Sequence, residues 1–372
     1  MMNPRIRKLA GLLIKHSCAL KPGERLLIEA IGVPNQMVIA LIREAKAVGG
    51  TPIVNIKDDQ VIRELCYCYE ADDVRLMADC ELYTLKQMDA FIGIRGFMNI
   101  SELSDVPEER FKRILEFYVR PVHLEQRNHH TKWVCLRWPT FSMAQRAGMS
   151  TEAFEDFYFD ACTLDYAKMD AAMDPLVRLM RETDRVKIVG PGDTDISFSI
   201  TGMSQCKYAG RHNIPDGELF TVPVRDTVDG RIRFNVPSAF YGTTFEDICI
   251  DFKDGKIVNA ACNNTDKLNE ILDQDAGARY VGEFAFGFNP CILKPMKDIL
   301  FDEKIMGSVH LALGNAYKEC DNGNRSAIHW DLILIQRPEM GGGGVFFDGT
   351  LIRQNGRFVL EELEGLNPEN LN

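Results

Sequence analysis

The sequence predicts an α/β protein: an N-terminal α/β domain with a largely parallel sheet, followed by a β-rich α+β domain. Helix-like and strand-like segments alternate along the first half of the chain, which is typical of a parallel sheet flanked by helices. Beyond residue 184, short strand-like runs are separated by Asp-Gly and Asn-Gly turns, which are typical of antiparallel hairpins. With 372 residues, the chain exceeds the size of one typical hydrophobic core. We therefore expect two domains, residues 1–184 and 185–372.

Apolar periodicity and turn residues bound each element of the first half. Pro22-Gly23 turns the chain into a first strand, and Gly49-Gly50 is a helix C-cap signal that precedes a second strand. The expected strands are Arg25–Ala30, Thr51–Ile56, Asp89–Ile94 and Thr131–Arg137. The expected helices are Arg5–His16, Pro34–Val48, Val61–Tyr69 and Asp72–Met88.

The second half changes character after a helical stretch that runs from Ser150 to Asp184. Ser150 or Thr151 is expected to cap the start of this stretch. Hairpin turns are then expected at Asp229-Gly230, Asp254-Gly255, Asp348-Gly349 and Asn355-Gly356.

Composition excludes several classes of partner. The formal net charge of −11 disfavours nucleic acid and anionic membrane surfaces. No run approaches the ~18 apolar residues of a membrane span, and no signal-peptide pattern is seen. The 11 cysteines are scattered and form no C-x-x-C pair, which indicates reduced thiols. We therefore expect a cytoplasmic protein without a thiolate zinc site.

The segment Asp302–Leu334 carries the strongest chemical signal. It contains His310 in one strand-like run and the triplet His329-Trp330-Asp331 in another. In a strand, residues i and i+2 point to the same face, so His329 and Asp331 would emerge side by side as a pair of metal ligands. Each histidine alone is equally well a satisfied core residue. Together with the aspartate, they would be costly to bury without a partner.

Two glutamates in the β-rich half complete the candidate site. Glu283 lies in the run Val281–Asn289, where three phenylalanines alternate with Glu283, Ala285 and Gly287. A carboxylate that shares its face with only small side chains has room beside it for an ion and a substrate. Glu218 follows a turn at the start of another strand, where a solvated glutamate is the ordinary interpretation.

These segments resemble the metallo-aminopeptidase family that includes aminopeptidase T and aminopeptidase S, the thermophilic-type leucyl aminopeptidases. The resemblance is carried, in order, by PDGELFTVP (215–223), VGEFAFGFN (281–289), DEKIMGSVHLALGNAY (302–317) and SAIHWDLI (326–333). It extends to PTFSMAQRAGMS (139–150) and to Pro22-Gly23-Glu24, and so covers nearly the whole chain. The connection between Tyr317 and His329 is shorter than in better-known members.

The resemblance implies a dinuclear metal site in the C-terminal domain, with the ligands Glu218, Glu283, His310, Tyr317, His329 and Asp331. Carboxylates, imidazoles and a phenol suit zinc, cobalt or manganese and also admit magnesium. Two divalent ions against three carboxylates leave a positive surplus that would lower the pKa of Tyr317. Such a site can activate a shared water and polarise a peptide carbonyl. The implied activity is removal of N-terminal amino acids from peptides that have a free N-terminus, and the implied assembly is a homodimer.

Two roles and two rival functions remain open. Glu283 is the expected catalytic base if it is not committed to a metal, and Glu303 is the second candidate, although a solvated position suits it better. Removing the Glu283 charge should leave metal-free stability level or slightly higher, because Glu283 would repel Glu218 and Asp331. One rival is a mononuclear non-haem iron oxygenase that uses His310, His329 and Asp331. The other is a non-catalytic peptide- or metal-binding protein.

Overall fold

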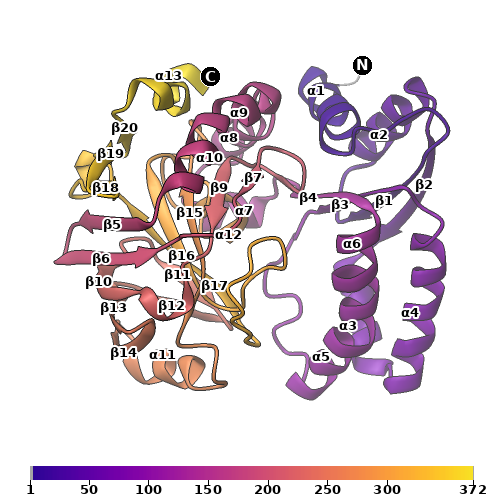
Figure 1. The fold of residues 1–372 in the computed structure, drawn as a ribbon. Coiled ribbons are helices and arrows are strands. Elements are labelled where there is room, and N and C mark those ends of the chain that lie inside the picture. Colours follow the sequence, from indigo (N-terminus) through magenta and orange to yellow (C-terminus); the bar gives the residue numbers. More distant parts are fainter. Residues whose placement is uncertain (1–2, 372) are drawn as a thin grey trace. The chain divides into compact units, whose positions relative to one another are not determined.

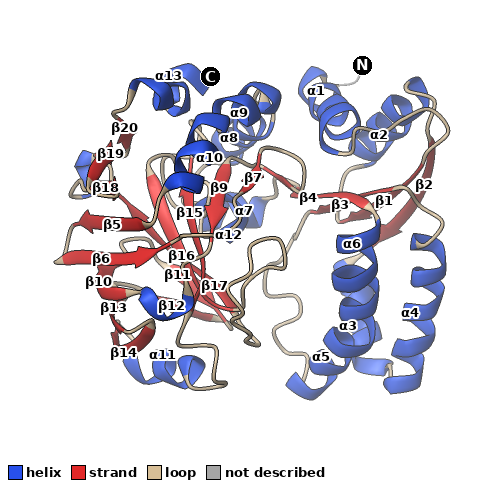
Figure 2. Ribbon diagram, in the orientation of Figure 1, coloured by secondary structure: helices blue, strands red, loops and turns tan. Residues whose placement is uncertain are grey.

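The computed structural model describes residues 3–371, which form two compact units. The first unit runs to Thr163 and also includes Gly210–Ile214. The second unit comprises Leu164–Ala209 and the chain from Pro215 onward. Figure 1 labels most of the helices and strands of both units, and Figure 2 distinguishes them by type.

The first unit is built on a parallel sheet with the strand order β2-β1-β3-β4-β8, as the alternation of helices and strands predicts. Helices α1 and α2 lie on one side of this sheet, and α3, α4 and α6 lie on the other (Figure 1). The strands are β1 Arg25–Ile31, β2 Thr51–Lys57, β3 Ala90–Arg95, β4 Lys132–Arg137 and β8 Asn213–Ile214. The α-helices are α1 Pro4–Leu12, α2 Asn35–Ala47, α3 Asp59–Cys68, α4 Ala71–Leu85, α5 Glu108–Ile114, α6 Asn128–His130, α7 Phe141–Arg146 and α8 Thr151–Cys162, and π-helical segments span Leu13–Ser17 and Leu115–Arg127.

Local signals explain several boundaries in this unit. The Ser150 hydroxyl accepts a hydrogen bond from the Ala153 backbone N–H at 3.2 Å, so Ser150 is the N-cap of α8. The predicted helix Arg5–His16 is instead α-helical only to Leu12 and continues in π-helical geometry to Ser17. On the α4 side of the sheet, the unit's core includes Leu27, Leu85 and Phe91.

The second unit is β-rich and its strand pairs are antiparallel, as the hairpin turns predict. One sheet has the order β14-β13-β10-β6-β5-β18-β19-β20, another has the order β17-β16-β15-β9-β7, and β11 pairs with β12. The first sheet contains β5 Arg185–Gly190, β6 Thr194–Ser199, β10 Asp229–Arg233, β13 Cys249–Lys253, β14 Lys256–Ala261, β18 Gly344–Phe347, β19 Thr350–Gln354 and β20 Arg357–Phe358. The others are β7 Cys206–Tyr208, β9 Glu218–Thr221, β11 Ser238–Phe240, β12 Thr243–Phe245, β15 Val281–Gly287, β16 Ser308–Gly314 and β17 His329–Ile335, and the α-helices are α9 Tyr166–Ala172, α10 Asp174–Glu182, α11 Thr265–Leu272, α12 Ile299–Asp302 and α13 Pro368–Leu371.

The units divide between Thr163 and Leu164, earlier than the domain boundary expected at residue 184. Helices α9 and α10 belong to the second unit because their side chains are tied to it. The Tyr166 hydroxyl accepts a hydrogen bond from the Asp216 backbone N–H at 2.9 Å, and the Lys207 ammonium donates to the Asp174 carboxylate at 2.7 Å. In the other direction, residues 210–214 join the first unit because β8 extends its parallel sheet beside β4.

Within residues 3–371, every helix is too short or too polar to cross a bilayer.

Candidate metal centre

The sheet β17-β16-β15-β9-β7 gathers the predicted ligands on one face. Residues directly opposite each other on neighbouring antiparallel strands share a face. Glu283 pairs with Ala312, which in turn pairs with Asp331, and His310 pairs with Ala285. In the next row, Glu218 pairs with Gly287. On this face, the small residues Ala285, Gly287 and Ala312 therefore lie between the ligand-type side chains, which come from four adjacent strands.

A bulge in β15 sets this register. Its pairing with β16 shifts between Val281 and Glu283, and the residue between them is Gly282. A Cβ atom on Gly282 would lie 2.5 Å from the carbonyl oxygens of Gly314 and Asn315, so a larger residue would force the backbone apart. Bulges of this kind re-aim side chains next to functional sites.

The Glu283 carboxylate lies between the two histidines. Its Oε1 atom is 3.1 Å from His310 Nε2, and its Oε2 atom is 3.8 Å from His329 Nε2. Glu218 Oε2 lies 3.7 Å from His310 Nε2, and Asp331 Oδ1 lies 3.4 Å from His329 Nε2. The ligand-type atoms therefore form two clusters that share Glu283.

Neighbouring groups orient His329 and Tyr317. His329 Nδ1 is 2.8 Å from the Asn315 carbonyl oxygen, so Nδ1 carries the proton and Nε2 faces the carboxylates. Tyr317 lies in the loop after β16, with its ring centroid 4.4 Å from that of His329 and 6.1 Å from that of Phe220. The structure thus brings all six predicted residues together.

The carboxylates strongly favour protonated histidines in the absence of a cation. Burial opposes the imidazolium of His310, yet the hydrogen bond to Glu283 and the charges of Glu218 and Asp331 raise its pKa to about 9. Burial likewise opposes the charged form of His329, but Asp331 and Glu283 raise its pKa to about 10. Cation binding must therefore displace protons from both imidazoles.

Desolvation has the opposite consequence for two acidic groups. Burial raises the pKa of Glu218 well above its ordinary value, although the Lys304 ammonium opposes this shift. Desolvation of the phenol and the charges of Glu283 and Asp331 also hold the pKa of Tyr317 above its ordinary value, although 41% of this residue is exposed. Before any cation binds, the phenol is therefore driven away from the phenolate form that two metal ions would favour.

Three charged residues beside the site complete its electrostatics. Lys304 is fully buried, and its ammonium donates to Glu218 Oε1 and to Glu303 Oε1, both at 2.6 Å. The ammonium also lies 3.7 Å from Asp216 Oδ1. Only 13% of the Glu303 side chain is exposed, so the solvated position expected for this residue is wrong. Sequence reasoning missed Lys304 and Asp216, and the one available signal was a lysine immediately before an apolar run.

The residues present fit divalent cations. Glu218 Oε2 is buried and finds no hydrogen-bond partner among residues 3–371, although it points at an imidazole. An unsatisfied buried carboxylate oxygen is costly unless a cation or a donor meets it. Carboxylate oxygens and imidazole nitrogens are ligands for zinc, cobalt and manganese.

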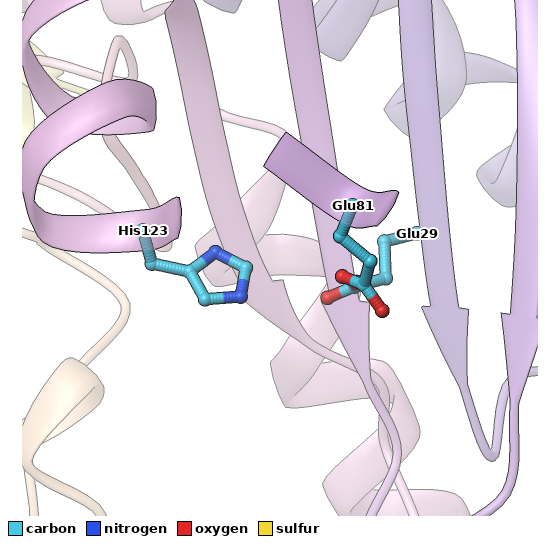
Figure 3. Close-up of side chains that lie close together, drawn as sticks. All are labelled: Glu29, Glu81 and His123. Atoms are coloured by element: carbon cyan, nitrogen blue, oxygen red, sulfur yellow. The ribbon is translucent and has the colours of Figure 1, made fainter. Parts of the chain in front are cut away.

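A second cluster of ligand-type atoms lies in the first unit. Glu29, Glu81 and His123 bring such atoms within 4.8 Å of one another, and Figure 3 shows the imidazole directed towards the carboxylates. The Lys57 ammonium already lies between the carboxylates, 2.8 Å from Glu29 Oε2 and 2.7 Å from Glu81 Oε1. The Tyr118 hydroxyl donates to Glu81 at 2.7 Å and is 3.1 Å from His123 Nε2. We interpret this cluster as a buried ion-pair network, which no local sequence pattern reveals.

Fold and site together describe a two-unit protein with a candidate metal centre on an antiparallel sheet. Residues 2–358 match the model of the thermophilic metalloprotease (M29) family, and the chain belongs to that family. This result confirms the resemblance found in the sequence motifs.

Individual proteins show the same relationship. Aminopeptidase T of Thermus thermophilus is 34% identical over 167 residues, which cover 40% of this chain and 40% of that protein. The match thus spans less than half of this relative. The structure of wild-type AmpT from Thermus thermophilus is similar over 96% of this chain and 99% of that one, with a TM-score of 0.79 and 23% identity. A 2,5-dihydroxypyridine dioxygenase from Pseudomonas putida KT2440 shares the fold, with a TM-score of 0.60 and 12% identity over 96% and 98% of the chains.

Proposed function

We propose that this protein is a metal-dependent aminopeptidase that removes N-terminal amino acids from peptides with the help of two divalent cations. The ligands would be Glu218, Glu283, His310, Tyr317, His329 and Asp331. The position of Glu283 carries the proposal, because one oxygen faces the cluster of His310 and the other faces the cluster of His329. Glu283 would therefore help to hold the cations of both clusters. The names of the aminopeptidase relatives support the substrate class.

Each residue of the site would have a defined task. Bound cations would supply Lewis acidity towards the scissile carbonyl and an activated water. Asn315 holds His329 with Nε2 directed at the site, and Lys304 holds Glu218 by one oxygen. Glu283 is the predicted base, but both of its oxygens face imidazoles. Glu303 would then accept the proton of the activated water, because it lies beside the site and the Lys304 ammonium donates a hydrogen bond to it.

The proposal extends to the metal, the substrate and the assembly. Zinc, cobalt or manganese would be the working cation, and magnesium also fits the ligand types. Substrates would be peptides with a free N-terminus, whose neutral amine binds more readily than the protonated one near two cations. The protein would work in the cytoplasm as a homodimer.

An iron-dependent oxygenase is the second candidate, because the structure resembles a dioxygenase in fold. In that case His310, His329 and Asp331 would hold a single iron. Glu218 and Glu283 would then have no task, although both lie within the same cluster of ligand-type atoms. The ligand count therefore favours the aminopeptidase.

Metal analysis combined with peptide hydrolysis tests the proposal. The purified protein is treated with a chelator, its metal content is verified as near zero, and zinc, cobalt or manganese is returned. Hydrolysis of amino-acid p-nitroanilides and short peptides is measured at each step, with N-acetylated peptides as the matched control. We expect two ions per chain, loss of activity on chelation, recovery on reconstitution, and no cleavage of acetylated peptides.

Three results would contradict the proposal. Full activity with almost no metal would exclude a metal mechanism. One iron per chain together with oxygen consumption would favour the oxygenase. Two bound ions without hydrolysis of any peptide would indicate a binding protein.

A further inference from the structure

Lys304 is a buried charge in contact with the candidate metal centre. Its side chain has no exposed surface, and its ammonium lies 2.6 Å from both Glu218 and Glu303. Burial of an ammonium group costs several kcal/mol unless carboxylates compensate for it. A lysine whose only role was to neutralise a buried charge could pair with any carboxylate, whereas Lys304 is paired with Glu218, a predicted metal ligand.

The contact divides the two oxygens of Glu218 between two tasks. Oε1 accepts from the Lys304 ammonium, and Oε2 has no protein donor within residues 3–371. Oε2 lies 3.7 Å from His310 Nε2, and both residues belong to the cluster of ligand-type atoms that also includes Glu283. Held in this way through Oε1, Glu218 keeps Oε2 available for a cation.

The charges around the centre support the same assignment. Five carboxylates lie around one ammonium, so acidic groups are in excess at a centre that would hold two divalent cations. The carboxylates are Glu218, Glu283, Asp331, Glu303 and Asp216.

We infer that Lys304 is a positioning residue for the metal centre: it holds Glu218 through Oε1 so that Oε2 is presented to the cation bound with His310. Lys304 also keeps Glu303 beside the site. This inference rests on the proposed function, because it requires two cation sites.

Metal binding by charge-matched variants tests the inference. Lys304→Met keeps an unbranched side chain of similar length but removes the ammonium. Lys304→Met with Glu303→Gln removes one charge of each sign, so it keeps the net charge but not the contact with Glu218. Lys304→Arg keeps the charge and a donor. The control is Lys267→Met, a partly exposed lysine of α11 whose ion pair is with Glu270.

Zinc or cobalt content and affinity are measured by elemental analysis in chelator-buffered solutions, and the visible spectrum of bound cobalt reports its coordination. We expect two ions in the wild type and in Lys267→Met. In Lys304→Met and in the double variant, one ion should bind ~10–100-fold more weakly, with an altered cobalt spectrum, as is typical when a residue that orients a ligand is lost. Lys304→Arg should restore part of this affinity. The kcat for a peptide should fall more than its KM rises.

Two results would overturn the inference. Two ions bound at wild-type affinity by Lys304→Met would show that Lys304 has only a structural role. Recovery of both ions in the double variant would show that charge balance, not positioning, matters. If Lys304→Met does not fold, Lys304→Gln provides the same test, because undiminished affinity there also refutes positioning by the ammonium. A wild type that binds fewer than two ions would instead refute the proposed function.

Discussion

Replacement of Glu283 by glutamine separates two opposite expectations for the metal-free protein. Sequence reasoning expects stability to hold or rise, because a negative charge near Glu218 and Asp331 is removed. The structure reverses this expectation, since Glu283 lies 3.1 Å from His310 and 3.8 Å from His329. Both imidazoles are protonated at neutral pH when no cation is bound, and Glu283 is therefore a partner for two positive charges.

The magnitude follows from the histidine pKa values. A rise of the His310 pKa from 6.5 to about 9 corresponds to ~3 kcal/mol of stabilisation of its protonated form. Glu283 is one of three carboxylates responsible, so Glu283→Gln should cost the metal-free protein ~1–3 kcal/mol at pH 7. The folded-state pKa is the higher one, so this stabilisation is fully present below pH 6.5. It is lost as the pH rises through about 9 for His310 and about 10 for His329.

Chemical unfolding at pH 7 and pH 10.5, with a chelator present, measures this effect. We expect the difference between wild type and variant to shrink at the higher pH. Glu362→Gln, at an exposed glutamate, is the matched control and should have little effect at either pH. With metal restored, Glu283→Gln should lose ~10²-fold or more of its hydrolysis rate. A metal-free variant as stable as the wild type at pH 7 would show that repulsion from Glu218 and Asp331 outweighs attraction to the histidines.

Two further predictions concern the first unit and the assembly. His123 is buried with Nδ1 lacking a partner among residues 3–371, and this burial lowers its pKa from 6.5 to about 3. Near pH 6.5 His123 therefore binds a proton in the unfolded chain but stays neutral in the folded chain. Between pH 7 and pH 5 this difference should lower the free energy of unfolding of the first unit by ~2 kcal/mol. Unfolding curves at the two pH values should show this loss in the wild type and in the exposed control His130→Gln, but not in His123→Gln. An equal loss in all three proteins would show that His123 is not the residue responsible. Light scattering at micromolar concentration should give twice the mass of one chain, and the mass of a single chain would refute the proposed homodimer.

Local sequence patterns were enough to predict much of the architecture. The parallel sheet and the antiparallel second unit follow from the alternation of elements and from Asp-Gly and Asn-Gly turns, because these signals act over a few residues. The facing of His329 and Asp331 follows from strand periodicity alone. The division between the units could not be located in this way, since α9 and α10 join the second unit through contacts with residues such as Asp216 and Lys207, which lie far away in sequence.

The sequence by itself determined which residue types could bind a metal, because each motif places a carboxylate, an imidazole or a phenol in a recognisable context. Only the tertiary structure decided their charge environment. It placed Glu283 between two imidazoles, left little of Glu303 exposed, and brought Lys304 against Glu218. The physical reason is that burial and through-space charge depend on which strands and loops pack together, and residues 218, 283, 304 and 310 come close only once β9, β15 and β16 pair.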